Sequence, residues 1–278
     1  MRRATAMSSL LYVYAILPAG APAVLALRGG AVHGIDGGIV TCVEAAGLAA
    51  AVSAVAPSAF EAEPLNLLVR DMDWLAPRAA AHQHVNALLL DQTDALIPLT
   101  FGTVYRTAAR IVAMLETERE ALTSCLERVR GKAEWVLSLQ RQTEEALAAL
   151  ERQSDALREV RARIATGAPG RAYLLSRQLE TIRQRELLSM DGRAVAALDD
   201  LLPTVGETFP ERVGAGPEPG PLARLSVLVG RPHESGLLAA VAGYRQHWSG
   251  LGYDLRLTGP WPPYRFSTRG AELLSAGR

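Results

Sequence analysis

Cysteine, lysine and net charge are all scarce in this chain, and each absence narrows the possible functions. Cys42 and Cys125 are the only cysteines. They lie far apart with no CxxC spacing, so the sequence indicates neither a zinc site nor a disulfide framework. Lys132 is the only lysine. Lys plus Arg and Asp plus Glu number 29 each, so there is no overall basic field to attract nucleic acid or anionic lipid. We therefore expect no nucleic-acid partner.

Long hydrophobic runs are also absent. The Ala-rich stretch 45–56 falls short of the ~20 apolar residues that a membrane span requires, so we expect no transmembrane segment. The N-terminus imitates a secretory signal peptide, with Arg2-Arg3 before the apolar run 10–17. That run is short, however, and it alternates as a strand does. We expect residues 1–21 to remain in the mature protein and to form a central or near-central strand.

The common enzymatic motifs are missing as well. The chain contains no GxxxxGK[ST], HExxH or GxSxG, and its glycine clusters lack the spacing of a dinucleotide-binding fold. His82 and His84 are two positions apart, so on a helix they point to different sides and cannot share one metal ion. Helix capping accounts for the carboxylate pair Asp71 and Asp73 more simply than catalysis does. The sequence therefore predicts no catalytic residues, no bound metal and no cofactor.

Among the features that are present, the stretch 96–106, LIPLTFGTVYR, is the most informative. It predicts a strand up to Phe101, a break at Gly102 and a long helix at 107–129. Gly102 is the natural pivot, because a residue without Cβ can take the backbone angles that turn a strand into a helix. Thr103 or Thr107 can then accept a hydrogen bond from the first free N–H groups of that helix. The expected structural residues of this stretch are Pro98, Gly102 and Thr103.

A second stretch of this kind, 253–266, lies near the other end of the chain. It predicts a strand at 253–258. The expected structural residues after it are Gly259, Pro260, Pro262 and Pro263. Because proline cannot donate to a sheet, the strand must end there or lie at an edge. The aromatic residues of this stretch are Trp261, Tyr264 and Phe266. They either seal the core of the second domain or form an aromatic docking edge.

The order of predicted strands and helices indicates an α+β protein with two domains. We place the first at 1–131 and the second at 132–266, with a flexible tail at 267–278. The second domain is expected to contain a helical insertion at about 141–190 and a Pro/Gly-rich loop at 203–222.

The insertion is predicted to be a hairpin of two amphipathic helices, 144–164 and 171–190. A Gly-Ala-Pro-Gly turn separates them, and Asp191-Gly192 closes the second. Their charged faces are interpreted as solvated surface, and no block of one charge sign stands out in the chain.

Five segments carry a family signature: LYVY at 11–14, IPLTFGT at 97–103, GKAEW at 131–135, GRAYL at 170–174 and LTGPWPPY at 257–264. Together they make the chain resemble the gas vesicle accessory proteins of the GvpL/GvpF family over nearly its whole length. The last segment is the most specific, because a proline-flanked tryptophan after a strand rarely recurs by chance. The family often has an arginine where this chain has Thr100. No role of that arginine is therefore carried over to this chain.

This resemblance implies two ferredoxin-like or modified ferredoxin-like modules, the second with a helical hairpin insertion. It also implies a cytoplasmic, non-enzymatic protein associated with gas vesicles. Such a protein would bind the small hydrophobic shell subunit, and other gas vesicle accessory proteins, and assist nucleation or growth of the shell. A subunit with an apolar gas-facing side aggregates unless that side or its strand edges are covered.

The expected partner-binding residues are Phe101 and Tyr105 in the first domain and Trp261, Tyr264 and Phe266 in the second. We expect apolar contacts and backbone pairing, not charge, to dominate this binding. Two alternatives remain open: a minor structural component of the shell, and a ligand-binding regulator built on ferredoxin-like modules. The sequence does not distinguish an F-type from an L-type member.

Overall fold

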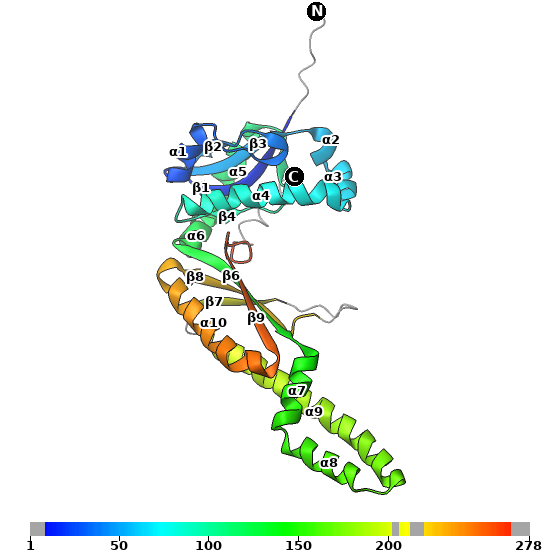
Figure 1. The fold of residues 1–278 in the computed structure, drawn as a ribbon. Helices are drawn as coiled ribbons and strands as arrows, with labels where there is room; N and C mark the ends of the chain where they lie inside the picture. The colour runs from blue at the N-terminus through cyan, green and yellow to red at the C-terminus, as the bar shows by residue number, and fades with distance from the viewer. Residues whose placement is uncertain (1–8, 202–205, 212–219, 268–278) are drawn as a thin grey trace, which may run out of the picture. The chain divides into compact units, whose positions relative to one another are not determined.

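The computed structural model describes residues 9–201, 206–211 and 220–267, and these form a mixed helix-and-sheet protein. The described chain divides into two compact units (Figure 1). The first unit is discontinuous: it contains the residues up to Glu134 and those from Pro260 onward. The second unit is Trp135–Gly259.

An antiparallel sheet in the order β2-β3-β1-β4 forms the centre of the first unit, and β5 pairs with β1 on the same side as β4. Its strands are β1 (Leu10–Pro18), β2 (Thr41–Ala45), β3 (Leu48–Val55), β4 (Ile97–Pro98) and β5 (Val104–Tyr105). β1 has strand neighbours on both sides, so the prediction of a central strand at 10–17 is confirmed. β4 and β5 occupy one edge of the sheet.

Helices cover both faces of this sheet. They are α1 (Pro22–Arg28), α2 (Pro57–Phe60), α3 (Ala62–Leu68), α4 (Met72–Asp91), α5 (Ala108–Thr117) and α6 (Arg119–Val129), with the 3-10 turn η1 (Ile35–Gly37). Tyr12 and Tyr14 of β1 pack with α4 in one core, whereas Val13 and Ile16 pack with α5 and α6 in the other. A register shift between Val13 and Ala15 places Val13 and Ile16 on the same face. The sheet therefore lies between two helical layers.

The helix predicted at 107–129 is two helices with a break at Glu118, so that prediction is wrong in its continuity. Glu116 and Glu120 would repel each other at i and i+4 of a continuous helix, and acidic side chains at the C-terminus of α5 oppose its dipole. Both helices still bury their apolar positions against the sheet, including Ile111, Leu115 and Leu122.

The second unit has its own sheet, in the order β7-β8-β6-β9. Its strands are β6 (Lys132–Arg141), β7 (Glu207–Glu211), β8 (Ala223–Gly230) and β9 (Tyr253–Trp261). Between β8 and β9 lie the helix α10 (Glu234–Trp248) and the 3-10 turns η3 (Arg231–His233) and η4 (Ser249–Leu251). The strand β7 lies inside the segment predicted as loop, 203–222, and corrects that prediction. A strand that contains Pro210 is possible here because β7 lies at the edge of the sheet, where the missing N–H of proline leaves no hydrogen bond unmade. Residues 202–205 and 212–219 of the predicted loop are outside the described chain.

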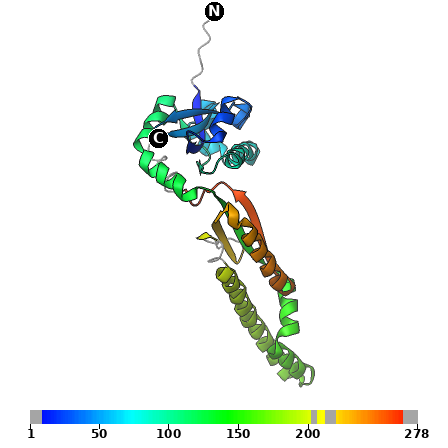
Figure 2. The ribbon, with the colours of Figure 1, turned by 90° about the vertical axis from the view of Figure 1, so that its left-hand side faces the viewer.

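The insertion consists of three helices, α7 (Thr143–Gln153), α8 (Asp155–Ala165) and α9 (Pro169–Leu201), and we call it the helical arm. Both views show α8 lying along α9 (Figures 1 and 2). The helix predicted at 144–164 is broken at Ser154, whose hydroxyl accepts from the Leu157 N–H of α8. The second predicted helix does not end at Asp191-Gly192. Asp191 accepts hydrogen bonds from Arg141 and Tyr253 and fixes the helix there, so α9 continues to Leu201.

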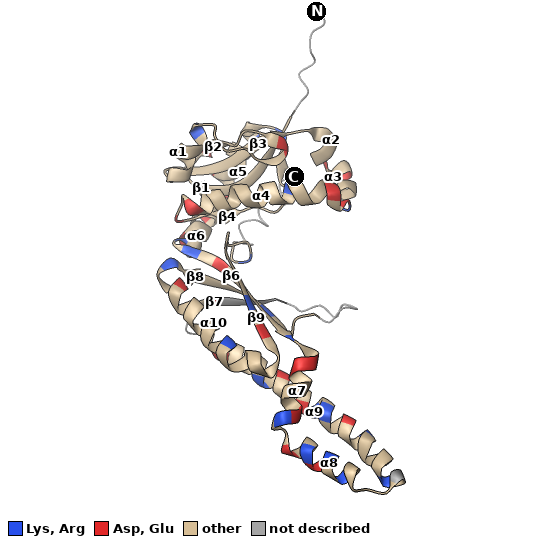
Figure 3. Cartoon of the chain, viewed as in Figure 1, with Lys and Arg blue, Asp and Glu red and all other residues tan. Residues whose placement is uncertain are grey.

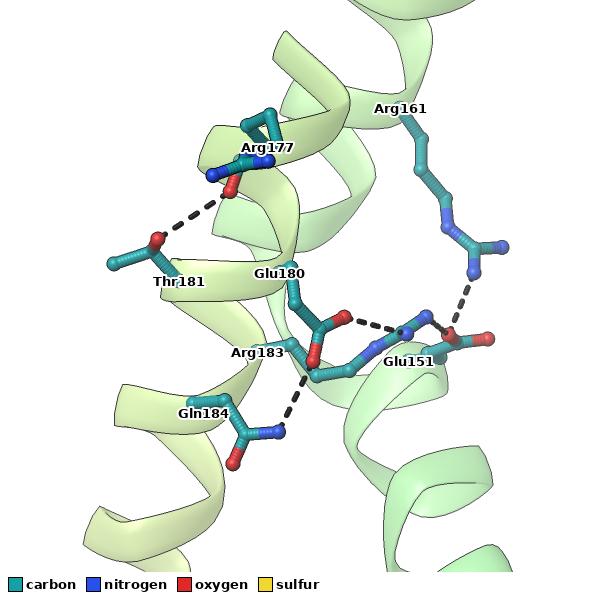
Figure 4. Close-up of polar contacts among 7 residues, drawn as sticks. All are labelled: Glu151, Arg161, Arg177, Glu180, Thr181, Arg183 and Gln184. Carbon is teal, nitrogen blue, oxygen red and sulfur yellow. Dashed lines mark hydrogen bonds and ion pairs between the residues drawn. The ribbon is translucent and has the colours of Figure 1, made fainter. Parts of the chain in front are cut away.

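A shared carboxylate links the helices of the arm. Glu151 of α7 pairs with Arg161 of α8 at 2.6 Å and with Arg183 of α9, which also contacts Glu180 (Figure 4). Both Glu151 and Arg183 are half-buried. This contact supports the packing of three helices that bury few large side chains.

The division of the chain differs from the predicted boundary at 131. The sequence assigned 260–266 to the second domain, whereas these residues group with the first unit. Tyr264 explains the difference, because its hydrogen-bond partners Asn86 and Gln83 lie in the first unit. Ser267, predicted as the start of a flexible tail, is buried, and its hydroxyl donates to the Pro263 carbonyl. Residues 268–278 are outside the described chain.

Candidate partner-binding site

A cavity of about 310 Å³ lies in the first unit beside β5, at the edge of the sheet. Its apolar lining comes from β1, α2, α3 and β5, namely Leu10, Phe60, Ala62, Leu65, Val104 and Tyr105. Glu61, Arg106 and Arg110 add charge to the lining, and Arg106 pairs with Glu61 at 3.4 Å. These three residues are exposed, so the cavity has apolar walls and a charged mouth. We call it the edge cavity.

Two short helices build one wall of the edge cavity. Pro57 begins α2, where its fixed φ suits the first helical turn and its missing N–H is not needed. Glu61 then takes an extended conformation and separates α2 from α3. The turn directs Phe60 into the core, where it is fully buried, while Ala62 remains exposed at the cavity.

Gly102 also lines this cavity. Its φ is +86°, in the left-handed region that the sequence argument expected for a pivot. A Cβ at this position would lie 2.7 Å from Leu65 Cδ2, so the bare backbone lets α3 approach the turn. Its N–H donates to Tyr12 Oη at 3.1 Å. The turn leads into β5 before the helix begins, and Thr107, not Thr103, accepts from the Arg110 N–H as the cap of α5.

The other structural residues of this stretch are buried. Thr103 donates from its hydroxyl to the Thr100 carbonyl, and its own carbonyl accepts from the Val13 N–H. Pro98 pairs with Ala15 in the β1–β4 ladder. Both hold the strand edge against β1.

An aromatic cluster lies behind the cavity. The ring of Phe101 is 5.9 Å from Tyr12, 6.0 Å from His82 and 6.3 Å from Phe60, measured between centroids. Trp74 completes the cluster, and the guanidinium of Arg78 lies 4.5 Å above its ring. Phe101 therefore contributes mainly to packing, whereas Tyr105, although only 7% exposed, lines the cavity.

His82 lies in a buried polar network. Its Nδ1 is 2.8 Å from Tyr12 Oη, and its Nε2 is 3.0 Å from Asn86 Nδ2 and 3.2 Å from Tyr264 Oη. Burial lowers the pKa of His82 to about 4, so the ring is neutral at neutral pH. His84 lies on the exposed side of α4, as its spacing predicted. Among the described residues, no three His, Cys, Asp or Glu side chains gather as a metal site would require.

The segment 260–267 is held in the first unit by this same network. Tyr264 Oη accepts from Asn86 and donates to Gln83, and burial raises the pKa of Tyr264 to about 12. The Arg265 N–H donates to Glu134. Phe266 is 3% exposed and Trp261 is 37% exposed.

The prolines at the start of this segment meet both outcomes expected for them: Pro260 lies in an edge strand, and Pro262 and Pro263 follow its end. β9 is at the end of its sheet, and it continues through Pro260 to Trp261 instead of stopping at Thr258. Gly259 has a φ of 139°, which favours glycine. Pro262 and Pro263 follow the strand, and their carbonyls accept from the Tyr264 and Ser267 N–H groups.

The structure separates the five aromatic residues predicted to bind a partner. Phe101 lies in the aromatic cluster, Tyr105 lines the edge cavity, Tyr264 anchors the segment 260–267 through its hydrogen bonds, and Phe266 is buried in that segment. Trp261 is the most exposed of the five. Sequence reasoning missed the contribution of 60–65 to the cavity. The signal available was a pair of prolines, Pro57 and Pro64, each followed within three residues by a large apolar residue, Phe60 and Leu65 respectively.

None of the described helices combines the length and the apolar composition that crossing a membrane requires.

Similarity to known proteins is consistent over the whole described chain. The model of the family described as gas vesicle synthesis protein GvpL/GvpF matches residues 10–268. A gas vesicle protein L of a Streptomyces species is 31% identical over 93% of this chain and 92% of that protein. Gas vesicle protein L1 of Halobacterium salinarum is 28% identical over 84% of this chain and 83% of that protein.

Two crystal structures share the fold. The gas vesicle protein GvpF from Anabaena superposes with a TM-score of 0.69 at 17% identity, covering 94% of this chain and 98% of that one. GvpF from Microcystis aeruginosa gives a TM-score of 0.63, also at 17% identity, covering 94% and 99%.

Proposed function

Because this chain belongs to the GvpL/GvpF family of gas vesicle synthesis proteins, we propose that it is an accessory protein that binds the hydrophobic shell subunit and assists nucleation or growth of the shell. The edge cavity is the observation that carries this proposal. The cavity has an apolar lining and lies beside the edge of a sheet. Proteins that bind an extended apolar segment use both features: the sheet edge pairs with its backbone, and a pocket receives its side chains.

The geometry suits such a segment in two ways. A partner strand laid along β5 can pair its backbone with the sheet edge, as in other cases of strand addition. One or more of its side chains can enter the edge cavity, whose volume is within the ~300–1,000 Å³ range of ligand pockets. An apolar segment covered in this way is withheld from aggregation until the shell takes it up.

The aromatic residues predicted for binding have unequal roles in this proposal. Tyr105 contacts the bound segment directly, and Phe101 supports the cavity from behind. Trp261 is a separate candidate contact, because this residue is 37% exposed. Tyr264 and Phe266 hold the segment 260–267 and do not contact the partner.

Three further features belong to the same proposal. The protein acts in the cytoplasm and without catalysis, and other gas vesicle accessory proteins are further partners. Each unit is a ferredoxin-like module, the second modified by the helical arm. The strand orders β2-β3-β1-β4 and β7-β8-β6-β9 support this, because both place the first strand of the unit between its third and its last.

Co-expression with the shell subunit, followed by pull-down, tests the proposal. Ala62→Trp fills the edge cavity from an exposed position, so we expect at least a tenfold loss of binding, equivalent to about 1.4 kcal/mol. Ala80→Trp is the matched control, because Ala80 is an exposed residue of α4 that does not line the cavity. It should bind as the wild type does.

Salt dependence separates apolar from ionic binding. Raising salt from about 0.1 to about 1 M shortens the Debye length to about 3 Å and should leave binding unchanged or stronger. Failure of the wild type to bind the subunit contradicts the proposal. So does binding that falls steeply with salt, or that is equal in the Ala62→Trp and Ala80→Trp variants.

A further inference from the structure

A cationic and apolar patch lies at the end of the helical arm, where α8 turns back into α9. It consists of Arg163, Arg171, Tyr173, Leu174 and Arg177, and we call it the arm-tip patch. Tyr173 is 65% exposed and Leu174 is 68% exposed. On α9, Tyr173 and Arg177 are i and i+4, and Leu174 is three residues from both Arg171 and Arg177, so these side chains adjoin.

The arginines of this patch differ from the others of the arm. Arg161 and Arg183 are engaged by Glu151, and Arg158 by Asp155. Within the described chain, no ion pair engages the guanidinium groups of Arg163, Arg171 and Arg177, and all three are exposed. Between positions 156 and 179 the sequence has five arginines and one acidic residue, Glu159. This local block of charge was not apparent from the neutral total.

The first unit has a patch of the opposite charge built in the same way. It consists of Glu63, Leu67, Asp71, Met72 and Asp73, and we call it the α3–α4 patch. Leu67 is 68% exposed and Met72 is 64% exposed. Figure 3 shows acidic residues on α3 and both basic and acidic residues along α8.

The charges of the α3–α4 patch are largely available to a partner. Glu63 and Leu67 are i and i+4 on α3, so they adjoin. Asp71 caps α4 through the Asp73 N–H and keeps its negative charge at the surface. Arg70 is the cation nearest in sequence, so three carboxylates and one guanidinium leave a net charge of −2. Glu61 is already paired with Arg106.

We propose that the arm-tip patch of one copy of this chain docks on the α3–α4 patch of a second copy. Each patch has two large apolar side chains beside charges of one sign, and the signs are opposite. The arginine–carboxylate pairs would supply much of the affinity and set the orientation, and apolar burial would add to the affinity. The zero net charge means that no overall repulsion opposes association.

The two patches are different surfaces, so the contact is head to tail. Such an interface leaves one unused patch at each end, and association continues to longer chains of copies unless the geometry closes a ring. This inference does not depend on binding of the shell subunit, and none of its residues lines the edge cavity.

Sedimentation velocity of the full chain tests the inference. We expect the sedimentation coefficient of the wild type to rise with concentration at about 0.1 M salt and to fall when salt is raised to about 1 M. Arg171→Glu/Arg177→Glu and Glu63→Arg/Asp73→Arg should each weaken association at least tenfold. The control Arg152→Glu/Arg193→Glu changes the net charge of the arm equally at exposed arginines away from the tip. It should associate as the wild type does.

Mixing the two patch variants gives the sharpest result. The mixture contains one native arm-tip patch and one native α3–α4 patch, and the two reversed patches are also opposite in charge, so an equimolar mixture should recover the association that each variant alone has lost. Thermal melts check that each variant is folded.

The inference is wrong if the wild type remains monomeric at low salt, if either patch variant associates normally, or if the mixture stays monomeric. It is also wrong if the wild type stays monomeric but floats with anionic phospholipid vesicles in a way that Arg171→Glu/Arg177→Glu abolishes. The arm-tip patch would then be a lipid-binding surface.

Discussion

The two units have the same strand order but differ in what connects their strands. In the first unit, the connection from β1 to β2 contains α1, a helix of 7 residues, and the turn η1. In the second, the connection from β6 to β7 contains α7, α8 and the 33-residue α9. The sheet order is therefore compatible with very different insertions. All three proposed binding surfaces draw on connections: the edge cavity uses α2 and α3 beside β1 and β5, the arm-tip patch uses α8 and α9, and the α3–α4 patch uses α3 and α4.

The two units also differ in the polar side chains that they bury. The first unit buries a neutral histidine among tyrosines, whereas the second buries the carboxylate of Asp191 between Arg141 and Tyr253. Acid should therefore affect the two units unequally, and substitutions in equivalent turns should have unequal costs.

The largest effect should come from the segment that returns to the first unit. Phe266→Ala removes a buried ring and should cost about 3–5 kcal/mol, whereas Trp261→Ala, at a partly exposed ring, should cost clearly less. Chemical denaturation of both variants measures the difference. Equal costs would show that 260–267 is not part of the core of the first unit.

The next largest effect should come from two glycines with a positive φ, Gly252 in the second unit and Gly102 in the first. Gly252 has a φ of +81°, and a Cβ there would lie 2.3 Å from the backbone N of Ala146. Gly252→Ala should cost about 2–4 kcal/mol from strain and overlap. At Gly102 the obstruction is the flexible end of Leu65, so Gly102→Ala should cost about 1–2 kcal/mol and Gly102→Val at least 1 kcal/mol.

Gly192 provides the control for both glycine variants, because its φ is not positive and open space surrounds it within α9. Gly192→Ala should stabilise the protein by about 0.5–1 kcal/mol. Melting temperatures in the order Gly192→Ala, Gly102→Ala, Gly252→Ala, from highest to lowest, are expected. A different order would refute the comparison of the two turns.

Acid should destabilise the first unit through His82. Its pKa is about 4 when folded and about 6.5 when unfolded, so the unfolded chain binds the extra proton between these values. The stabilisation is complete above pH 6.5 and is lost as pH falls towards 4, by about 3 kcal/mol. Denaturation curves at pH 7 and pH 4, with an NMR titration of His82, measure this. His82→Gln should remove this part of the pH dependence, and an unchanged dependence would contradict the assignment.

The smallest effect concerns the ion pairs of the helical arm. Glu151→Gln should cost about 0.5–1 kcal/mol, because its contacts with Arg161 and Arg183 are only partly buried. Glu145→Gln, at an exposed carboxylate of the same helix, is the control and should have almost no effect on the melting temperature. A large loss in Glu151→Gln would mean that the arm depends on this contact more than its exposure indicates.

Local features were predictable from the sequence where the backbone conformation or the alternation of apolar residues allows few structures. The alternation at 10–17 predicted a central strand. Gly102 was expected to be a pivot because a residue without Cβ takes backbone angles that others avoid, and its φ is positive. The prolines at 260–263 predicted an edge or an end, and β9 lies at an edge.

Helix ends and long-range contacts could not be predicted in the same way. Asp191-Gly192 is a common helix stop, but Arg141 and Tyr253 bind Asp191 from distant parts of the chain and α9 continues past it. Tyr264 contacts Asn86, which is 178 residues away in sequence, so its unit could not be inferred from position. The edge cavity combines β1, α2, α3 and β5, and no local pattern joins them.

The most direct test of the central claim, that the edge cavity receives the shell subunit, is site-specific photo-crosslinking during co-expression. A benzophenone amino acid at position 62 lies at the cavity, and the same group at position 80 lies on the exposed side of α4 away from it. The account predicts a crosslink to the shell subunit from position 62 and none from position 80. Crosslinking from position 80 alone, or equally from both positions, would contradict it.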